Sequence, residues 1–236
     1  MKAADGSAAY DSGTEGLPLG LCLALVLGFL APLVVACGGP GESPQDQARD
    51  EFRQAQVLQD QGNLRRAGDA YSLAVSLDPG LAEAYVGRGT VYLAYGNVQP
   101  ALADFDRAID LDPDLATAYN YRGMAFVEGG DLQSAVLDFT KAIRVDPGLA
   151  AAYLNRARVN MEEGDLDGAI ADMSFAIGLE PQVVEHYMER AQLRLLAEDA
   201  DGAAADLEKV LSLTQDEDVA LAAKRLLSLV RQRVGP

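Results

Sequence analysis

The sequence predicts an all-α fold, a solenoid of about five stacked helix pairs that ends in a capping helix. A proline returns every 34 residues, at Pro79, Pro113, Pro147 and Pro181. An alanine in the middle of each period returns at the same interval, at Ala67, Ala101, Ala135, Ala169 and Ala203. A period of this length is typical of a helix pair that buries its apolar face by stacking on a neighbouring pair.

The period divides residues 48–217 into five units, which we number 1 to 5: 48–81, 82–115, 116–149, 150–183 and 184–217. The two end units depart from the pattern, with Glu51 where the others have tyrosine and Gln215 in place of the closing proline. Terminal repeats have only one neighbour and are often atypical. Residues 218–236 follow as a predicted amphipathic helix that covers the apolar face left open by unit 5.

Within each unit, the residue types predict two antiparallel helices that approach closely. Small residues at positions 8, 20 and 27 allow close packing, and large side chains at position 24 fill the space beside them. Glycine followed by Asn or Asp separates the two helices of units 1 to 4, at Gly62, Gly96, Gly130 and Gly164. We expect each glycine to end the first helix with a positive φ and the next residue to cap the second helix.

A charge pattern recurs with the same period. Arginines occupy position 7 at Arg88, Arg122, Arg156 and Arg190, and aspartates occupy position 23 at Asp104, Asp138, Asp172 and Asp206. These positions face each other across the two helices of a unit. We therefore predict an Arg–Asp ion pair in each of units 2 to 5.

These motifs resemble the tetratricopeptide repeat over about 170 residues, with tyrosine at position 4 (Tyr85, Tyr119, Tyr153 and Tyr187) and the small residues and proline described above. The resemblance implies a right-handed superhelix with a concave groove lined by the first helix of each unit. It also implies that positions 5, 9 and 12 of the first helices bind a peptide. The implied groove residues are Val86, Thr90, Leu93, Asn120, Met124, Val127, Leu154, Arg158, Met161 and Met188.

The implied groove is mostly apolar, and its methionines are adaptable contact residues. Repeats of this family that clamp a C-terminal carboxylate use Lys and Asn at positions 5 and 9, where unit 2 has Val86 and Thr90. The sequence therefore favours an extended or helical apolar segment as the partner.

The composition of the N-terminal 37 residues indicates a targeting segment. Residues 1–16 have no periodicity and are expected to be disordered, and residues 17–36 form an apolar run without a charge. The run ends in Val34-Val35-Ala36-Cys37, which resembles the lipobox of bacterial lipoproteins. That resemblance implies cleavage before Cys37 and a lipid (diacylglycerol and palmitate) on its thiol. An uncleaved membrane anchor is the alternative, and residues 38–47 are predicted to be a flexible linker in both cases.

Composition argues against several kinds of function. The net charge of −17 repels nucleic-acid phosphates, and the two cysteines, Cys22 and Cys37, both precede the repeats. The chain's one histidine, His186, cannot form a triad or a zinc site by itself, and we expect it to be a solvated helix residue. We therefore expect no catalytic residues, no cofactor and no metal.

The sequence thus predicts a protein–protein interaction scaffold of the bacterial cell envelope, not an enzyme. It would be anchored to the cell membrane or the outer membrane, with its repeats on the extracytoplasmic side. The alternative is a self-associating structural or assembly factor, of the pilus or secretion type, that keeps an uncleaved membrane helix.

Overall fold

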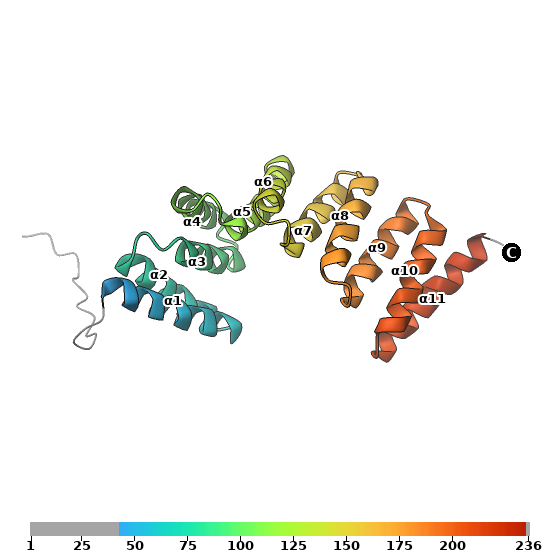
Figure 1. Cartoon of the computed structure of the whole chain (residues 1–236), viewed down its shortest axis with the longest axis horizontal. Coiled ribbons are helices and arrows are strands. Elements are labelled where there is room, and N and C mark those ends of the chain that lie inside the picture. Colours follow the sequence, from blue (N-terminus) through green and yellow to red (C-terminus); the bar gives the residue numbers. More distant parts are fainter. Residues whose placement is uncertain (1–42, 235–236) are drawn as a thin grey trace, which may run out of the picture. The chain divides into compact units, whose positions relative to one another are not determined.

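A computed structural model of the chain describes residues 43–234, which form eleven α-helices and no strand (Figure 1). In chain order these are α1 (Pro44–Asp60), α2 (Leu64–Leu77), α3 (Ala82–Ala94), α4 (Val98–Leu111), α5 (Ala116–Glu128), α6 (Leu132–Val145), α7 (Ala150–Glu162), α8 (Leu166–Leu179), α9 (Val184–Leu196), α10 (Ala200–Leu213) and α11 (Glu217–Val234). The predicted targeting segment and Cys37 lie outside the described residues.

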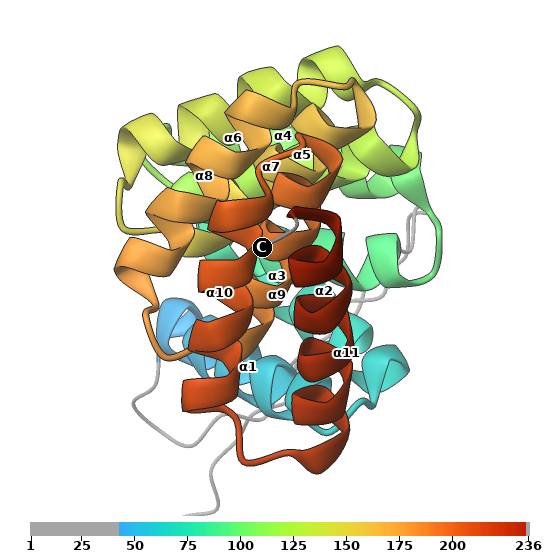
Figure 2. The ribbon, with the colours of Figure 1, turned by 90° about the vertical axis from the view of Figure 1, so that its right-hand side faces the viewer.

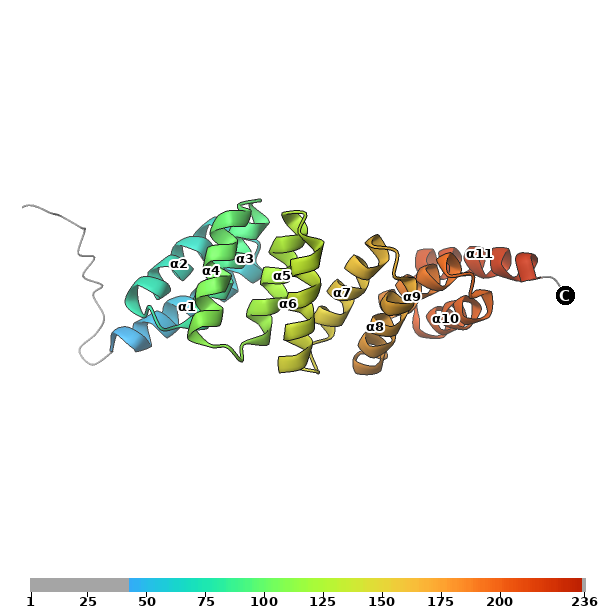
Figure 3. The same cartoon turned by 90° about the horizontal axis from the view of Figure 1, so that it is seen from above.

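Each helix packs mainly against its neighbours in the chain, as Figure 3 shows for α5 to α8. The odd-numbered helices α1 to α9 are the first helices of the five units, and the even-numbered helices α2 to α10 are the second helices. The first helices α1, α3, α5 and α7 also contact one another in succession. We call the surface that they share the inner face. Consecutive packing of helix pairs confirms the predicted solenoid.

The turns between paired helices follow the expected backbone geometry. The glycines that end the first helices of units 1 to 4 have φ values of 72° to 85°. In unit 5 the same place is held by Glu198, the one non-glycine residue with a positive φ among residues 43–234, at 60°. A side chain costs free energy in this conformation, whereas glycine does not.

Most of the predicted helix caps also form. The Asp131 carboxylate accepts a hydrogen bond from the Ser134 backbone N–H at 3.1 Å, and Asn63 and Asp165 cap α2 and α8 in the same way. The prediction was wrong at Asn97, whose side chain accepts no capping hydrogen bond at the start of α4. The backbone carbonyl of Asn97 still accepts the first helical bond, from Ala101 N–H at 3.2 Å.

The core of each unit contains the small residue and the large apolar residue that the sequence repeats at positions 20 and 24. The mid-unit alanines are completely buried in all five units. Position 24 is buried in every unit, although its side chain changes along the chain: Tyr71, Phe105, Phe139, Met173 and Leu207. Close approach of the helices at alanine leaves a space beside it that a large apolar side chain fills.

The predicted Arg–Asp ion pairs form in all four units. In each, the arginine donates Nε and Nη2 to the two aspartate oxygens at 2.6 to 2.9 Å, so the pair is bidentate. The aspartates are buried. Hydrogen bonding to Asp138 raises the pKa of Arg122, which keeps the guanidinium charged. Unit 1 lacks both members, with Gln54 and Ala70 in their places.

Three of these arginines also connect consecutive units, which the sequence did not reveal. The remaining guanidinium nitrogen, Nη1, donates to a side chain at position 25 of the preceding unit. The partners are Asp106 for Arg122 at 2.7 Å, Thr140 for Arg156 at 2.9 Å and Ser174 for Arg190 at 2.9 Å. One side chain therefore joins three helices at each of these junctions.

The last helix, α11, lies beside α10 (Figure 2). Its buried residues Ala223, Leu227 and Val230 share one apolar cluster with Leu207 and Val210 of α10. The helix thereby removes the apolar side of unit 5 from water. Within residues 43–234, no helix combines the length and the apolar composition that crossing a membrane requires.

Candidate functional site

An apolar hollow of about 200 Å³ lies on the inner face, between α3, α5 and α7. It gathers four of the ten residues that the sequence singled out for peptide binding: Leu93, Met124, Val127 and Arg158. We call it the central hollow. The residues Glu128, Phe139, Asn155, Val159 and Glu162 complete its lining. Partly buried Leu, Met and Val side chains at a concave surface suit an apolar side chain of a partner.

The charges around the central hollow are mostly acidic. Glu128 and Glu162 are exposed at the ends of α5 and α7, and neither forms an ion pair within the described part of the chain. The Arg158 guanidinium is held by Glu189 of the next unit, with 3.2 Å between Nη2 and Oε1. Since the arginine already has a carboxylate partner, the net field at the rim is negative.

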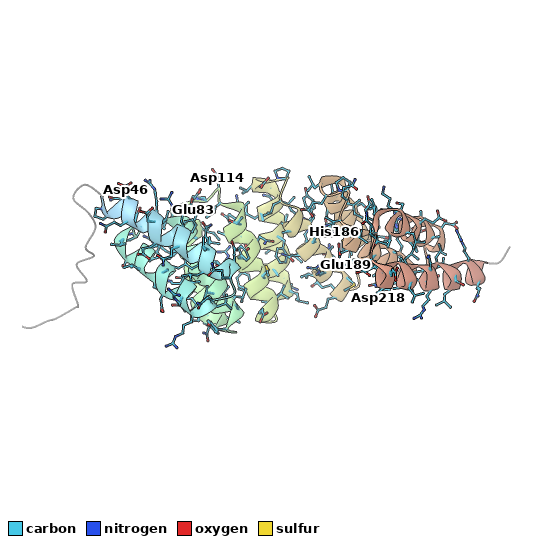
Figure 4. All side chains as sticks on the ribbon, turned by 90° about the horizontal axis from the view of Figure 1, so that it is seen from below. Asp46, Glu83, Asp114, His186, Glu189 and Asp218 are labelled. Carbon is cyan, nitrogen blue, oxygen red and sulfur yellow. The ribbon has the colours of Figure 1, made fainter. Side chains whose placement is uncertain are left out.

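A second and larger hollow, of about 670 Å³, lies between α1, α3 and α5. It takes in two more of the predicted residues, Val86 and Thr90, and we call it the N-terminal hollow. The sequence did not single out the other residues around it, which include Phe52, Gln59, Tyr71, Glu83 and Tyr121. Glu83 is labelled in Figure 4.

A chain of hydrogen bonds fixes the polar side chains of the N-terminal hollow. Tyr71 donates its hydroxyl to Gln59 Oε1 at 2.9 Å, and Gln59 Nε2 donates to Thr90 Oγ1 at 3.2 Å. Thr90 in turn donates to the Gly87 carbonyl oxygen at 2.7 Å. Burial raises the pKa of Tyr71 to about 12, so its hydroxyl keeps the proton that it donates. The network joins α1, α2 and α3.

The other four predicted groove residues, Asn120, Leu154, Met161 and Met188, line neither hollow. Asn120 is buried, and its Oδ1 accepts a hydrogen bond from Asn155 Nδ2 at 3.0 Å. Leu154 and Met188 pack against apolar clusters of units 4 and 5, while Met161 is exposed. The structure therefore brings six of the ten residues to two separate hollows.

His186 does not behave as the sequence suggested. The expectation of a solvated side chain was wrong, because His186 is buried on α9 (Figure 4). Its Nε2 lies 2.8 Å from Oε2 of Glu180, which directly follows α8. Packing of α8 against α9 brings the carboxylate to the ring nitrogen. Over residues 43–234, no three His, Cys, Asp or Glu side chains gather closely enough to hold a metal ion.

Comparison with solved structures finds the same fold in several proteins. TTC0263, a protein of Thermus thermophilus, is 25% identical, with a TM-score of 0.63, and the alignment covers 77% of this chain and 99% of that one. YrrB, described as having an unusual peptide-binding site, is 22% identical, with a TM-score of 0.57 and coverage of 75% and 92%. PilW, a type IV pilus biogenesis factor, is 20% identical, with a TM-score of 0.66 and coverage of 79% and 91%. No curated protein matches the sequence.

Family models lead to the same fold. One tetratricopeptide repeat model matches residues 82–115, and a second matches residues 121–174 and 154–218. Together the matches cover more than half of the chain and include four of its five units. The protein belongs to the tetratricopeptide repeat family.

Proposed function

We propose that the protein is a non-catalytic scaffold of the bacterial cell envelope that binds a peptide or protein segment on its inner face. Proteins built from tetratricopeptide repeats are interaction scaffolds that bind protein or peptide partners, typically without catalysing a reaction. The observation that carries the proposal is the central hollow, where Leu93, Met124 and Val127 come together from two helices. An apolar side chain of the partner would enter it.

The charge of the protein supports a protein partner over a nucleic acid. A net charge of −17 and the acidic rim of the central hollow oppose a phosphate backbone. The same rim favours a segment that carries Lys or Arg beside its apolar residue. No cofactor and no metal take part in the proposed function.

The substitution Met124→Asp tests the central hollow. It places a carboxylate in an apolar cavity from which a bound partner must displace water. Because burying that charge costs free energy, we expect the partner's affinity to fall by about tenfold or more. Residues 38–236 would first be used to isolate the partner from envelope extract, and the affinity of the purified pair would then be measured by calorimetry. Met161→Asp is the matched control, because Met161 is exposed and lines neither hollow. Equal affinity of the two variants would show that the partner binds elsewhere.

We propose further that Cys37 carries the lipid that holds the repeats outside the membrane. The apolar run 17–36, which ends in Val34-Val35-Ala36 directly before Cys37, supports this proposal. Cells supplied with labelled palmitate should incorporate the label into the wild-type protein but not into Cys37→Ser. Cys22→Ser is the control and should keep the label, because Leu21 precedes Cys22 where the lipobox has a small residue. An unlabelled wild-type protein that remains in the membrane fraction would instead indicate an uncleaved anchor.

A further inference from the structure

The outer surface of α8 differs from that of every other second helix. Its exposed residues after Asp167 are Ala171, Phe175, Gly178 and Leu179, and none is charged. The one charged residue between Gly168 and Leu179 is Asp172, which is buried and paired with Arg156. At positions 22, 25, 26 and 29, each of the other four second helices carries at least one charge. These residues are Asp69 on α2; Asp106, Arg107 and Asp110 on α4; Lys141 and Arg144 on α6; and Glu208 and Lys209 on α10. We call the uncharged surface the α8 face.

Phe175 dominates the α8 face. It is 62% exposed, and its ring stacks on Tyr153 with 5.4 Å between centroids. The equivalent residue of unit 3 is Lys141, whose Nζ lies 5.5 Å from the centre of the Tyr119 ring. Units 2 and 5 also have a cation there, Arg107 and Lys209. The fold therefore accepts a cation at this position, and unit 4 has replaced it with an exposed aromatic ring.

The neighbours of Phe175 leave room for a second ring. Ala171 lies one turn before it and Gly178 one turn after it, so the aromatic side chain stands between two small residues. A Cβ atom added to Gly178 would meet nothing within 4 Å. An exposed ring flanked by small residues on one helix is self-complementary, since the ring of one copy can lie against the small residues of another.

We propose that the α8 face is covered by a second copy of this chain in a two-fold symmetric dimer. The net charge of −17 makes two copies repel each other wherever acidic surfaces meet. The α8 face has no charge that adds to this repulsion, and it exposes two large apolar side chains, Phe175 and Leu179. Exposed carboxylates border this face only at its two ends, at Asp167 and Glu180. A basic partner therefore has no carboxylate to pair with between them, whereas an equally acidic partner meets no repulsion there. This surface lies on a second helix and is independent of the inner face of the proposed function.

The dimer predicts an unusual response to salt. Added salt should strengthen association, because it screens the repulsion between the two acidic copies and leaves the apolar contact in place. An interface held by ion pairs would weaken under the same conditions. Sedimentation velocity of residues 38–236, over about a hundredfold range of protein concentration and at low and high salt, should show a mass that rises to that of a dimer.

Phe175→Lys is the deciding variant. It restores the cation that unit 3 has over its tyrosine, so the fold should be kept while the dimer is lost. Leu137→Lys is the matched control, because Leu137 is 71% exposed on α6, outside the α8 face, and its substitution should leave the dimer unchanged. Two results would overturn the proposal. One is a wild-type protein that stays monomeric at every concentration and salt level. This result overturns the dimer even if the monomer binds neutral phosphatidylcholine vesicles through Phe175, which would make a lipid surface the occupant of the α8 face. The other is a Phe175→Lys variant that dimerises like the wild type.

Discussion

Asp138→Ala is expected to lower the free energy of unfolding by about 3 kcal/mol. The substitution removes both acceptors of a bidentate pair and leaves the Arg122 guanidinium without its main partner. The Arg122 side chain is 21% exposed and that of Asp138 is 9% exposed, so water replaces the lost carboxylate only in part. A partly buried cation that loses its buried carboxylate costs more than the ion pair itself contributes, and the exposed Asp106 compensates only in part. Urea denaturation followed by circular dichroism measures the effect.

Asp106→Ala provides a matched control on the same arginine. Asp106 also accepts a hydrogen bond from Arg122 at 2.7 Å, but its side chain is 59% exposed. We expect this loss to cost no more than about 1 kcal/mol, as is usual for exposed ion pairs. The double variant Arg122→Met with Asp138→Leu should recover most of the stability lost in Asp138→Ala, because no buried charge is left unpaired. Equal costs for Asp138→Ala and Asp106→Ala would mean that burial does not determine the strength of the pair.

Gly123→Ala is expected to destabilise the protein by about 1 to 3 kcal/mol, although alanine favours helices over glycine. A Cβ atom on Gly123 would lie 2.6 Å from Cε1 of Phe139, which is closer than carbon atoms pack. Phe139 is buried, so its ring can relieve this contact only by leaving its packed position and moving into the central hollow that it lines. Thermal unfolding of the variant should therefore begin at a lower temperature than that of the wild type.

The chain itself indicates how to rescue this variant. Units 4 and 5 have alanine at the position of Gly123 (Ala157 and Ala191), and they have Met173 and Leu207 where unit 3 has Phe139. We expect Phe139→Met to make Gly123→Ala nearly neutral, with a coupling of about 1 kcal/mol or more in a double-mutant cycle. Gly178→Ala, at a helical glycine with nothing near its Cβ position, should instead stabilise by about 0.5 to 1 kcal/mol when measured on the monomer. Purely additive effects of Gly123→Ala and Phe139→Met would show that the two side chains do not compete for space.

These two predictions rest on contacts that recur within a unit, and such contacts can be inferred from the sequence. Arg122 and Asp138 are 16 residues apart, and the same pair returns at the same separation in three other units. Comparison of the units shows that the arginine and the aspartate occur together or not at all, since unit 1 lacks both. The four ion pairs, the positive-φ glycines and the buried alanines could therefore be predicted, because a local contact is specified again by every copy.

Contacts between units that occur only once were not predictable in the same way. Gln59 bonds to Thr90, and Arg158 pairs with Glu189, each across 31 residues. Each of these pairs joins two different units, and neither recurs in the other copies, so no repetition reveals it. The contact of the buried His186 with Glu180 has the same origin, since it depends on how unit 4 packs against unit 5.

The sequence by itself determined the architecture, because a 34-residue helix pair must stack on copies of itself to bury its apolar face. Only the tertiary structure decided which side chains share a hollow, since this depends on the stacking of different units. It divided six of the ten implied groove residues between the central and N-terminal hollows, brought the other four to neither, and left Phe175 exposed on α8. Local patterns specify helices and their pairing, whereas a binding surface is formed by residues that meet only after the pairs have stacked.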